Sequence, residues 1–254
     1  MRDLGHGFYN LRGSFRLLGI DLKTQASLVR LSGGGFVLLD AIDLDEDQAR
    51  WLDAMTDGGE ALEAVLHLHP FHTVSVRSMH ERYPNAKLHG TARHRSKRDD
   101  LPWEDLHTDE PELHARYADD LTFTVPRGVE LVPANPNVHF SSVLVAHPAS
   151  KTLHVDDTLI YAKLPKPLRW AKKDTLRFHP TLAKALERRA GAAGDFRAWV
   201  HELVDLTADL DQLCAAHTHV LRVERDGGPP IADRIERALG KVDRTLAKHE
   251  RAYG

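Results

Sequence analysis

An apolar run that leads directly into three histidines sets the first limit on the fold of this chain. The stretch VLHLHPFH, residues 65–72, places His67, His69 and His72 in the spacing H-x-H-x-x-H. In an extended strand, residues i and i+2 point to the same side. We therefore expect His67 and His69 to present two imidazoles at the end of a strand, with His72 just past the turn. Because histidine is the commonest metal ligand, the stretch predicts a metal site. The alternative is a solvated strand end.

The composition is that of a globular protein without a strong bias in charge. The 254 residues are 42% hydrophobic and 28% charged, which allows a sizeable core. The formal charge of −3 gives no general attraction to nucleic acid or to anionic membranes. Cys214 is the one cysteine, so an internal disulfide and a CxxC zinc site are excluded. The start MRDLGHGFYN lacks the apolar segment of a secretory signal, and no apolar run has the length of a membrane span, so we expect a cytoplasmic protein.

Apolar periodicity and turn residues predict strands that come first in runs and then alternate with helices. The run from Ser32 to Gly35 predicts a hairpin turn. The stretch DLDEDQARWLDAMTDGG, residues 43–59, predicts a helix that is capped by Asp43 with Glu46. The other expected helices are residues 73–83, 180–190, 195–210 and 230–250, and the expected strands are residues 8–18, 26–31, 35–39, 61–69, 86–89, 121–125, 129–134, 139–146, 151–156 and 211–216. This order favours an α/β (α+β) fold of two sheets packed face to face, with helices outside.

Further ligand-type residues lie where other predicted strands begin or end. His139 begins one strand, Asp156 and Asp157 end the next, and His217 follows the last strand in AAHTHV. A metal site needs ligands from more than one element, and these residues are the candidates. Each of them also has an ordinary structural interpretation when it is taken alone, as a core histidine, a turn or a strand residue.

Taken in order, these motifs resemble those of the metallo-β-lactamase superfamily. That family carries H-x-H-x-D-H after a strand, then a lone His, then an Asp at a strand end, then a late Gly-His. Here HLHPFH, NVHFSS, LHVDDTLIY and CAAHTHVL follow in the same order, and LVRLSGGGFVLLDAID resembles the family's opening strands, which end in an Asp such as Asp40. The resemblance covers about residues 8–222. It implies a four-layer αβ/βα sandwich of two mixed sheets, built as a single domain of residues 1–254 that includes the helix at about 230–250.

The resemblance also implies the ligands of two metal sites and one defect. The ligands are, for the first metal, His67, His69 and His139, and for the second, His72, Asp157 and His217. Asp157 would bridge the two metals, and Asp157 and His217 are the residues expected to take part in catalysis. Asp156 is the alternative to Asp157, and His219 is the alternative to His217. Phe71 stands where the family has the Asp that binds the second metal and handles protons, so the second site lacks its carboxylate.

The expected chemistry follows from the metal. Zinc is the default, as one or two ions, and a His/Asp set also suits iron or manganese. Bound zinc lowers the pKa of its water to about 7 and polarises a carbonyl or phosphoryl oxygen. We therefore expect a metal-dependent hydrolase that uses a metal-bound hydroxide on an ester, lactone, amide or phosphoester of a small molecule. Phe71 favours the alternative, a non-hydrolytic relative that binds metal or does redox chemistry with iron. A third alternative is an interaction protein whose histidines are incidental.

Other polar segments receive simpler interpretations. The segment YAKLPKPLRWAKK, residues 161–173, carries five basic residues and follows Asp157 closely. A positive lid there would favour an anionic substrate, but we favour a solvated loop. RHRSKR around His94 is interpreted as a solvated face, and HELVD at 201–205 as helix surface rather than a zinc motif. Cys214 is expected to be a small buried residue. The sequence does not indicate an oligomeric state.

Overall fold

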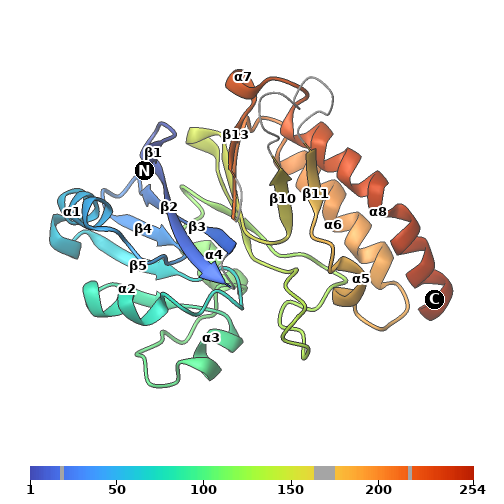
Figure 1. The fold of residues 1–254 in the computed structure, drawn as a ribbon, viewed down its shortest axis with the longest axis horizontal. Helices are drawn as coiled ribbons and strands as arrows, with labels where there is room; N and C mark the ends of the chain where they lie inside the picture. Colours follow the sequence, from blue (N-terminus) through green and yellow to red (C-terminus); the bar gives the residue numbers. More distant parts are fainter. Residues whose placement is uncertain (18–19, 163–174, 217–218) are drawn as a thin grey trace. The chain divides into compact units, whose positions relative to one another are not determined.

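The computed structural model describes residues 1–17, 20–162, 175–216 and 219–254 (Figure 1). The chain divides into two compact units, each with its own sheet and its own hydrophobic core. Unit 1 comprises Met1–Phe123 and His147–Ser150, and unit 2 comprises Thr124–Ala146 and Lys151–Gly254. The single domain expected from the sequence stays a prediction.

Unit 1 is built on a mixed sheet of order β1-β2-β3-β4-β5-β6. Its strands are β1 (Arg2–Asp3), β2 (Phe8–Leu17), β3 (Ile20–Arg30), β4 (Phe36–Leu39), β5 (Leu62–Leu66) and β6 (Lys87–His89). Its helices are α1 (Glu46–Met55), α2 (Val76–Arg82), α3 (Ala92–Lys97) and α4 (Pro111–Arg116), with a 3-10 helix at Asp57–Gly59. The first four strands pair antiparallel, whereas β4, β5 and β6 pair parallel. Short helices at 92–97 and 111–116 interrupt the polar segment between β6 and residue 120.

The predicted hairpin turn between β3 and β4 is confirmed. Leu31 N donates to Gly35 O at 2.8 Å, and Gly34 N donates to Leu31 O at 2.9 Å. Gly34 has φ of +99°, a conformation that only glycine adopts readily. The glycine run therefore forms the hairpin turn between β3 and β4.

The helix after β4 is also confirmed, but its predicted cap is two residues too early. Asp45, not Asp43, accepts from the backbone N–H of Gln48 at 2.8 Å, and the Gln48 side chain accepts from Asp45 N at 3.1 Å. Asp43 instead accepts a hydrogen bond from Ser78 of α2. Both candidate pairs satisfy the sequence rule of a capping box, and the tertiary contact of Asp43 decides between them. Leu52 of α1 and Met79 of α2 then join Leu38 and Val65 in the core of unit 1.

Unit 2 carries a second mixed sheet, of order β13-β12-β9-β8-β7, and a two-stranded sheet of β10 and β11. The strands are β7 (Thr122–Thr124), β8 (Leu144–His147), β9 (Thr152–Val155), β10 (Leu159–Ala162), β11 (Thr175–Phe178), β12 (Gln212–Ala215) and β13 (Val220–Arg222). The helices are α5 (Leu182–Ala185), α6 (Ala192–Leu206), α7 (Val223–Asp226) and α8 (Ile231–Tyr253). A 3-10 helix at Pro148–Ser150, directly after β8, belongs to unit 1. The prediction of two mixed sheets with helices is thereby confirmed.

Helices α6 and α8 lie side by side along β11 in Figure 1. The predicted apolar face of α6 is buried at Phe196, Trp199, Val200 and Leu203. The indole N–H of Trp199 donates to Thr124 Oγ1 at 2.8 Å, so this large side chain enters the core with its polar atom satisfied. Cys214 is buried in β12, as expected.

Three predicted strands are wrong in whole or in part. The strand expected at 139–146 begins only at Leu144, so His139 does not begin a strand. Residues 129–134 form no strand; Val129 makes only an isolated bridge with Leu186. The strand expected at 61–69 ends at Leu66, so strand alternation does not extend to His67 and His69.

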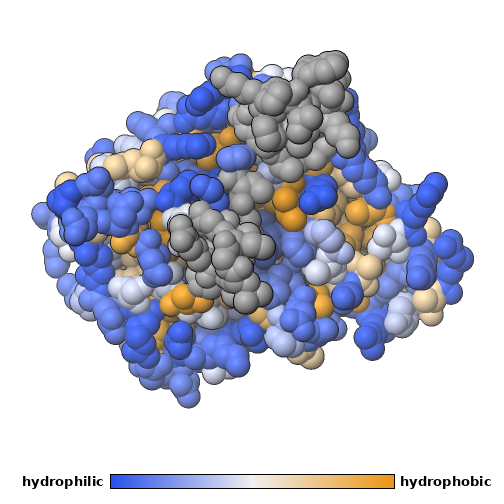
Figure 2. All heavy atoms as spheres, viewed as in Figure 1, coloured by the Kyte–Doolittle hydropathy of each residue, from blue (hydrophilic) through white to orange (hydrophobic). Residues whose placement is uncertain are grey.

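The described helices include none with the length and hydropathy of a membrane span. On the face drawn in Figure 2, hydrophilic residues predominate and hydrophobic residues show only in small areas.

Candidate metal centre

The predicted ligands of unit 1 lie at one edge of its sheet. Because β4, β5 and β6 run parallel, their carboxyl ends meet at the same edge. Backbone pairing continues just past them: Asp40 N donates to Leu66 O at 2.9 Å, and His67 N donates to His89 O at 2.9 Å. Ligands of open α/β sheets bind outside the carboxyl ends of the strands. This edge is therefore the place in unit 1 where the fold exposes polar groups for chemistry.

Asp40 fixes the loop that carries the histidines. It ends β4 in the left-handed region, with φ of +59°, and is 1% exposed. Its Oδ1 accepts a hydrogen bond from Leu68 N at 2.8 Å, between His67 and His69. A buried carboxylate that accepts from backbone N–H groups is held firmly. Asp40 therefore determines where the loop runs after β5.

His69 and His72 form a stacked pair on this loop. Their ring centroids lie 4.2 Å apart with an interplanar angle of 27°, and ligand-type atoms of the two residues lie within 4.8 Å of each other. His72 and Asp40 also offer ligand-type atoms within 4.8 Å. Nδ1 of His69 accepts from Phe71 N at 3.1 Å, which sets the orientation of the ring. The tight turn at Pro70–Phe71 thus brings the second and third histidines of the motif together.

His67 lies in the interior of unit 1, where its ring contacts His94 and Trp103. Its ring packs against His94 at 5.3 Å and against Trp103 at 5.7 Å between centroids, and it is 0% exposed. Neither ring nitrogen of His67 has a hydrogen-bond partner among the described residues. Burial first, and then the proximity of His94 and His72, holds the pKa of His67 well below its ordinary value. His67 is therefore neutral at neutral pH, which is the protonation state that binds metal.

His94 corrects the interpretation of RHRSKR as a solvated face. It is 0% exposed, and its Nδ1 accepts from Thr91 N at 3.2 Å, in a capping box at the start of α3. Burial lowers the pKa of His94 to about 3, although the backbone of His72 opposes this shift. In the sequence, the spacing T-x-x-H of Thr91 and His94 was the signal for this capping box. His89 is also buried, at the end of β6, where burial lowers its pKa.

Phe71 departs from the metal-ligand pattern and lies under an arginine. The guanidinium carbon of Arg93, from α3, is 4.1 Å from the centroid of the Phe71 ring. The Phe71 and His69 rings lie 6.0 Å apart. The position that lacks the expected carboxylate is thus next to a fixed positive charge, which sequence reasoning missed because the two residues are 22 positions apart.

The remaining predicted ligands belong to unit 2 or lie outside the described residues. Asp156 and Asp157 follow β9 directly and are 1% and 4% exposed. His139 is half-buried, and its Nε2 lies 2.8 Å from the backbone oxygen of Pro136 in its own loop. His217 and the basic segment at 163–174 fall outside the described residues. The two predicted ligand sets therefore stay predictions.

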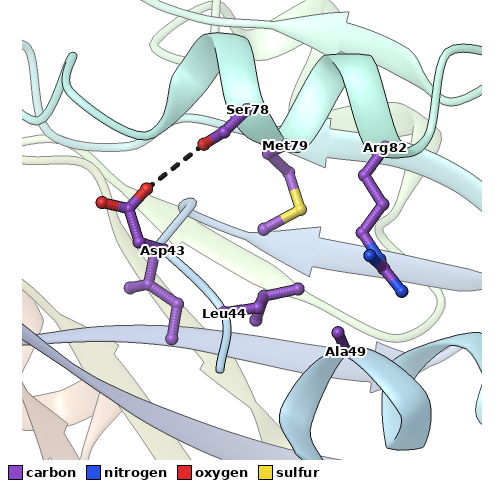
Figure 3. Close-up of a pocket in the computed structure, with 7 residues that line it drawn as sticks. Asp43, Leu44, Ala49, Ser78, Met79 and Arg82 are labelled. Carbon is purple, nitrogen blue, oxygen red and sulfur yellow. Dashed lines mark hydrogen bonds between the residues drawn. The ribbon is translucent and has the colours of Figure 1, made fainter. Parts of the chain in front are cut away.

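A small cavity in unit 1 is a separate feature (Figure 3). It encloses about 210 Å³ between α1, α2 and the loop after β4, and is lined by Ile42, Asp43, Leu44, Ala49, Ser78, Met79 and Arg82. Its polar side chains already pair within the protein: Ser78 donates to Asp43 at 3.2 Å, and Arg82 pairs with Asp53. None of the predicted ligands that the structure describes is among these lining residues. His201 and Glu202 of the near-zincin stretch are exposed on α6, as expected for helix surface.

Comparison with known proteins identifies the fold. No protein-family model matches the sequence, and no curated protein matches it. Among solved structures, a metallo-β-lactamase from Erythrobacter litoralis is 12% identical and covers 98% of this chain and 91% of its own, with a TM-score of 0.57. One from Pontibacter korlensis is 11% identical over 97% of both chains, with a TM-score of 0.58. The metallo-β-lactamase FIM-1 from Pseudomonas aeruginosa, solved in a mono-zinc form, is 11% identical over 94% and 93%, with a TM-score of 0.57.

These likenesses place the chain among proteins of the metallo-β-lactamase fold, as its motifs implied. The identities of 11% and 12% support the fold and leave the reaction open.

Proposed function

We propose that this protein is a metal-dependent hydrolase of a small molecule that carries an ester, lactone, amide or phosphoester bond. The observation that carries the proposal is the stacked pair of His69 and His72, with Asp40 beside His72, at the carboxyl edge of a sheet in this fold. A cytoplasmic location is part of the same proposal.

The residues of unit 1 fit a transition metal. Neutral imidazole and carboxylate are the donors that zinc, iron and manganese accept. His67 is wholly buried and has two ring nitrogens without a partner among the described residues. Leaving such nitrogens without a partner costs free energy, and a metal ion would offset this cost. Zinc is the metal that we propose first, as one or two ions.

The chain's own residues have distinct proposed roles. His67, His69 and His72 hold the metal, Asp40 positions their loop through Leu68, and the backbone N–H of Phe71 sets the His69 ring. Asp157, His139 and His217 are proposed as further ligands from the motif order alone. A metal ion, when bound, acts as a Lewis acid and makes a water molecule nucleophilic at neutral pH. Asp157 is then the candidate proton acceptor, since position 71 offers no carboxylate.

Metal content is the first experiment. We expect one or two equivalents of zinc, iron or manganese per chain, measured by plasma mass spectrometry on protein purified without a histidine tag. The double variant His69→Ala/His72→Ala should lose most of this metal, together with hydrolysis of a panel of nitrophenyl esters and phosphoesters. His201→Ala is the matched control, since His201 is exposed on α6. Equal metal content in the double variant and the control would remove the basis of the proposal.

A second candidate function is a non-hydrolytic metal-binding or iron-redox protein, and Phe71 favours it. Phe71→Asp separates the two candidates. In a hydrolase, the added carboxylate should raise metal content toward two equivalents and increase turnover of the panel. In a non-hydrolytic relative, metal content rises while the panel remains unhydrolysed. If neither quantity changes, the role assigned to position 71 is wrong.

A further inference from the structure

We infer that Arg93 and Arg98 form an anion-binding subsite over the histidine loop, and that Phe71 holds Arg93 in place for it. The inference rests on the proposed function and deepens it, because it assigns the substrate class: a small molecule with a phosphate or carboxylate group beside the bond that is cleaved.

The contact between Arg93 and Phe71 is the first observation. At 4.1 Å from the ring centroid, the guanidinium is well within the range of a cation–π interaction. Phe71 is half-buried and its backbone N–H is bound to His69, so the ring is fixed to the loop. The aromatic face orients the guanidinium without neutralising its charge.

The second observation is that Arg93 lacks an acidic partner within the part of the chain that the structure describes. Several other arginines in the described ranges pair with carboxylates, among them Arg77 with Asp100 and Arg127 with Glu202. No ion pair joins Arg93 to an acid among the described residues, and its buried Nε has no hydrogen-bond partner there. A fixed guanidinium next to a polar loop, without a counter-charge from the described residues, is suited to an anionic ligand.

Arg98 adds a second positive charge from the other end of α3. Its Nη2 approaches the backbone oxygen of Thr73 at 3.5 Å, directly after His72, and its buried Nε also lacks a partner among the described residues. Arg93 therefore contacts the loop on one side of His72 and Arg98 on the other. Between them, His94 anchors α3 through its capping bond with Thr91 and its packing on His67. This anchor holds both guanidinium groups relative to the loop.

The chemistry of these groups defines the ligand. Guanidinium groups donate paired N–H bonds to the oxygens of phosphate and carboxylate. An Asp at position 71 would lie close enough to pair with Arg93 and cancel its charge. With Phe71 at this position, the loop offers no carboxylate to a metal, and the guanidinium of Arg93 remains available to an oxyanion. We assign the subsite to the anionic group of the substrate.

The test measures anion binding in the full-length protein as purified. The probes are inorganic phosphate and acetate, titrated by calorimetry, with metal content determined on every sample. Arg93→Gln should weaken binding of the preferred anion about tenfold, the effect of losing a charged hydrogen bond. Phe71→Leu should weaken it about threefold, because the cation–π contact is lost. Lys97→Gln is the matched control; it removes a positive charge from the exposed side of the same helix and should leave binding unchanged.

The outcomes separate the subsite from the proposed function. Tighter binding of phosphate assigns a phosphate ester, and tighter binding of acetate assigns a carboxylate. If Arg93→Gln and Lys97→Gln bind equally, or if the unmodified protein binds neither probe, the subsite does not exist even where metal and hydrolysis are found. If anion binding depends on Arg93 but the protein takes up no metal, the subsite stands and the proposed hydrolase fails.

Discussion

His67 and His94 are buried together, although only His67 follows an apolar run in the sequence. Their rings lie 5.3 Å apart, and burial lowers the pKa of both. The sequence places His94 among five polar residues, which indicates a surface. Burial results from the Thr91–His94 capping box, which turns the ring inward. At the residue scale, a local hydrogen bond therefore accounts for the burial of His94, which the sequence places on the surface.

His147 offers a test of this effect away from the candidate metal centre. Its ring is buried beside Phe8, and its Nδ1 contacts Ser150 Oγ at 2.7 Å. Burial lowers the pKa of His147 below the ordinary value of 6.5; Asp120 opposes this shift and His6 adds to it. As pH falls below about 6.5, the unfolded chain binds a proton that folded His147 does not, so the free energy of unfolding falls.

We therefore expect wild-type stability to decrease from pH 6.5 to pH 5 more steeply than that of His147→Gln. The difference in slope should be at most about 1.4 kcal/mol per pH unit. Urea unfolding at several pH values measures it, with the exposed-site variant His201→Gln as the control. Parallel curves for wild type and His147→Gln would show that His147 titrates normally in the folded protein.

At the scale of the element, hydrophobic periodicity predicts the long helices best. The helix expected at 180–190 is only α5 (Leu182–Ala185), and several short strands were missed although β6 and β7 were predicted. Helices α6 and α8 agree with the apolar spacing of their sequences, because each buries one continuous face in the core of unit 2. Strands β1, β10, β11 and β13 have at most four residues and were not predicted. The stretch 129–134 has strand composition, yet only Val129 finds a bridging partner. A strand requires a neighbour that lies far away in sequence, whereas a helix supplies its own hydrogen bonds.

The cap of α1 is a prediction at this scale. Asp45→Ala removes the acceptor for Gln48 N and should lower the free energy of unfolding by about 1 kcal/mol, as loss of an N-cap typically does. Asp47→Ala is the control, because Asp47 pairs with Arg50 at an exposed site, where ion pairs contribute little. Chemical denaturation compares the two variants. A larger loss from Asp47→Ala would contradict the assigned cap.

At the scale of the whole molecule, each unit has a separate hydrophobic core. Leu38 belongs to the core of unit 1 and Leu203 to that of unit 2, and both are 0% exposed. The single domain proposed from the sequence requires the two cores to unfold together. A chain with independent domains would instead lose one core before the other.

Leu38→Ala and Leu203→Ala should therefore each lower the free energy of unfolding by about 2–5 kcal/mol and shift one shared transition. Val74→Ala, at a side chain that is 57% exposed, should change it by less than about 0.5 kcal/mol. Circular dichroism and tryptophan fluorescence during urea unfolding provide two probes. Transitions that separate in either core variant would mean that the two units are independent domains.

The sequence alone determined the motif order, the hairpin at Gly34, the helices α6 and α8, and the fold class. Each of these depends on residues close together in the chain, or on the order of motifs along it. The tertiary structure decided which histidines meet, that Asp40 binds Leu68, that His94 is buried, and that Arg93 lies over Phe71. The Asp40–Leu68 and Arg93–Phe71 contacts join residues that are more than 20 positions apart and that meet at one edge of the parallel strands. The His69–His72 pair and the cap of His94 are local, but the other residues that bury them are distant in sequence. Periodicity carries no information about such contacts, because they arise only when the sheet has formed.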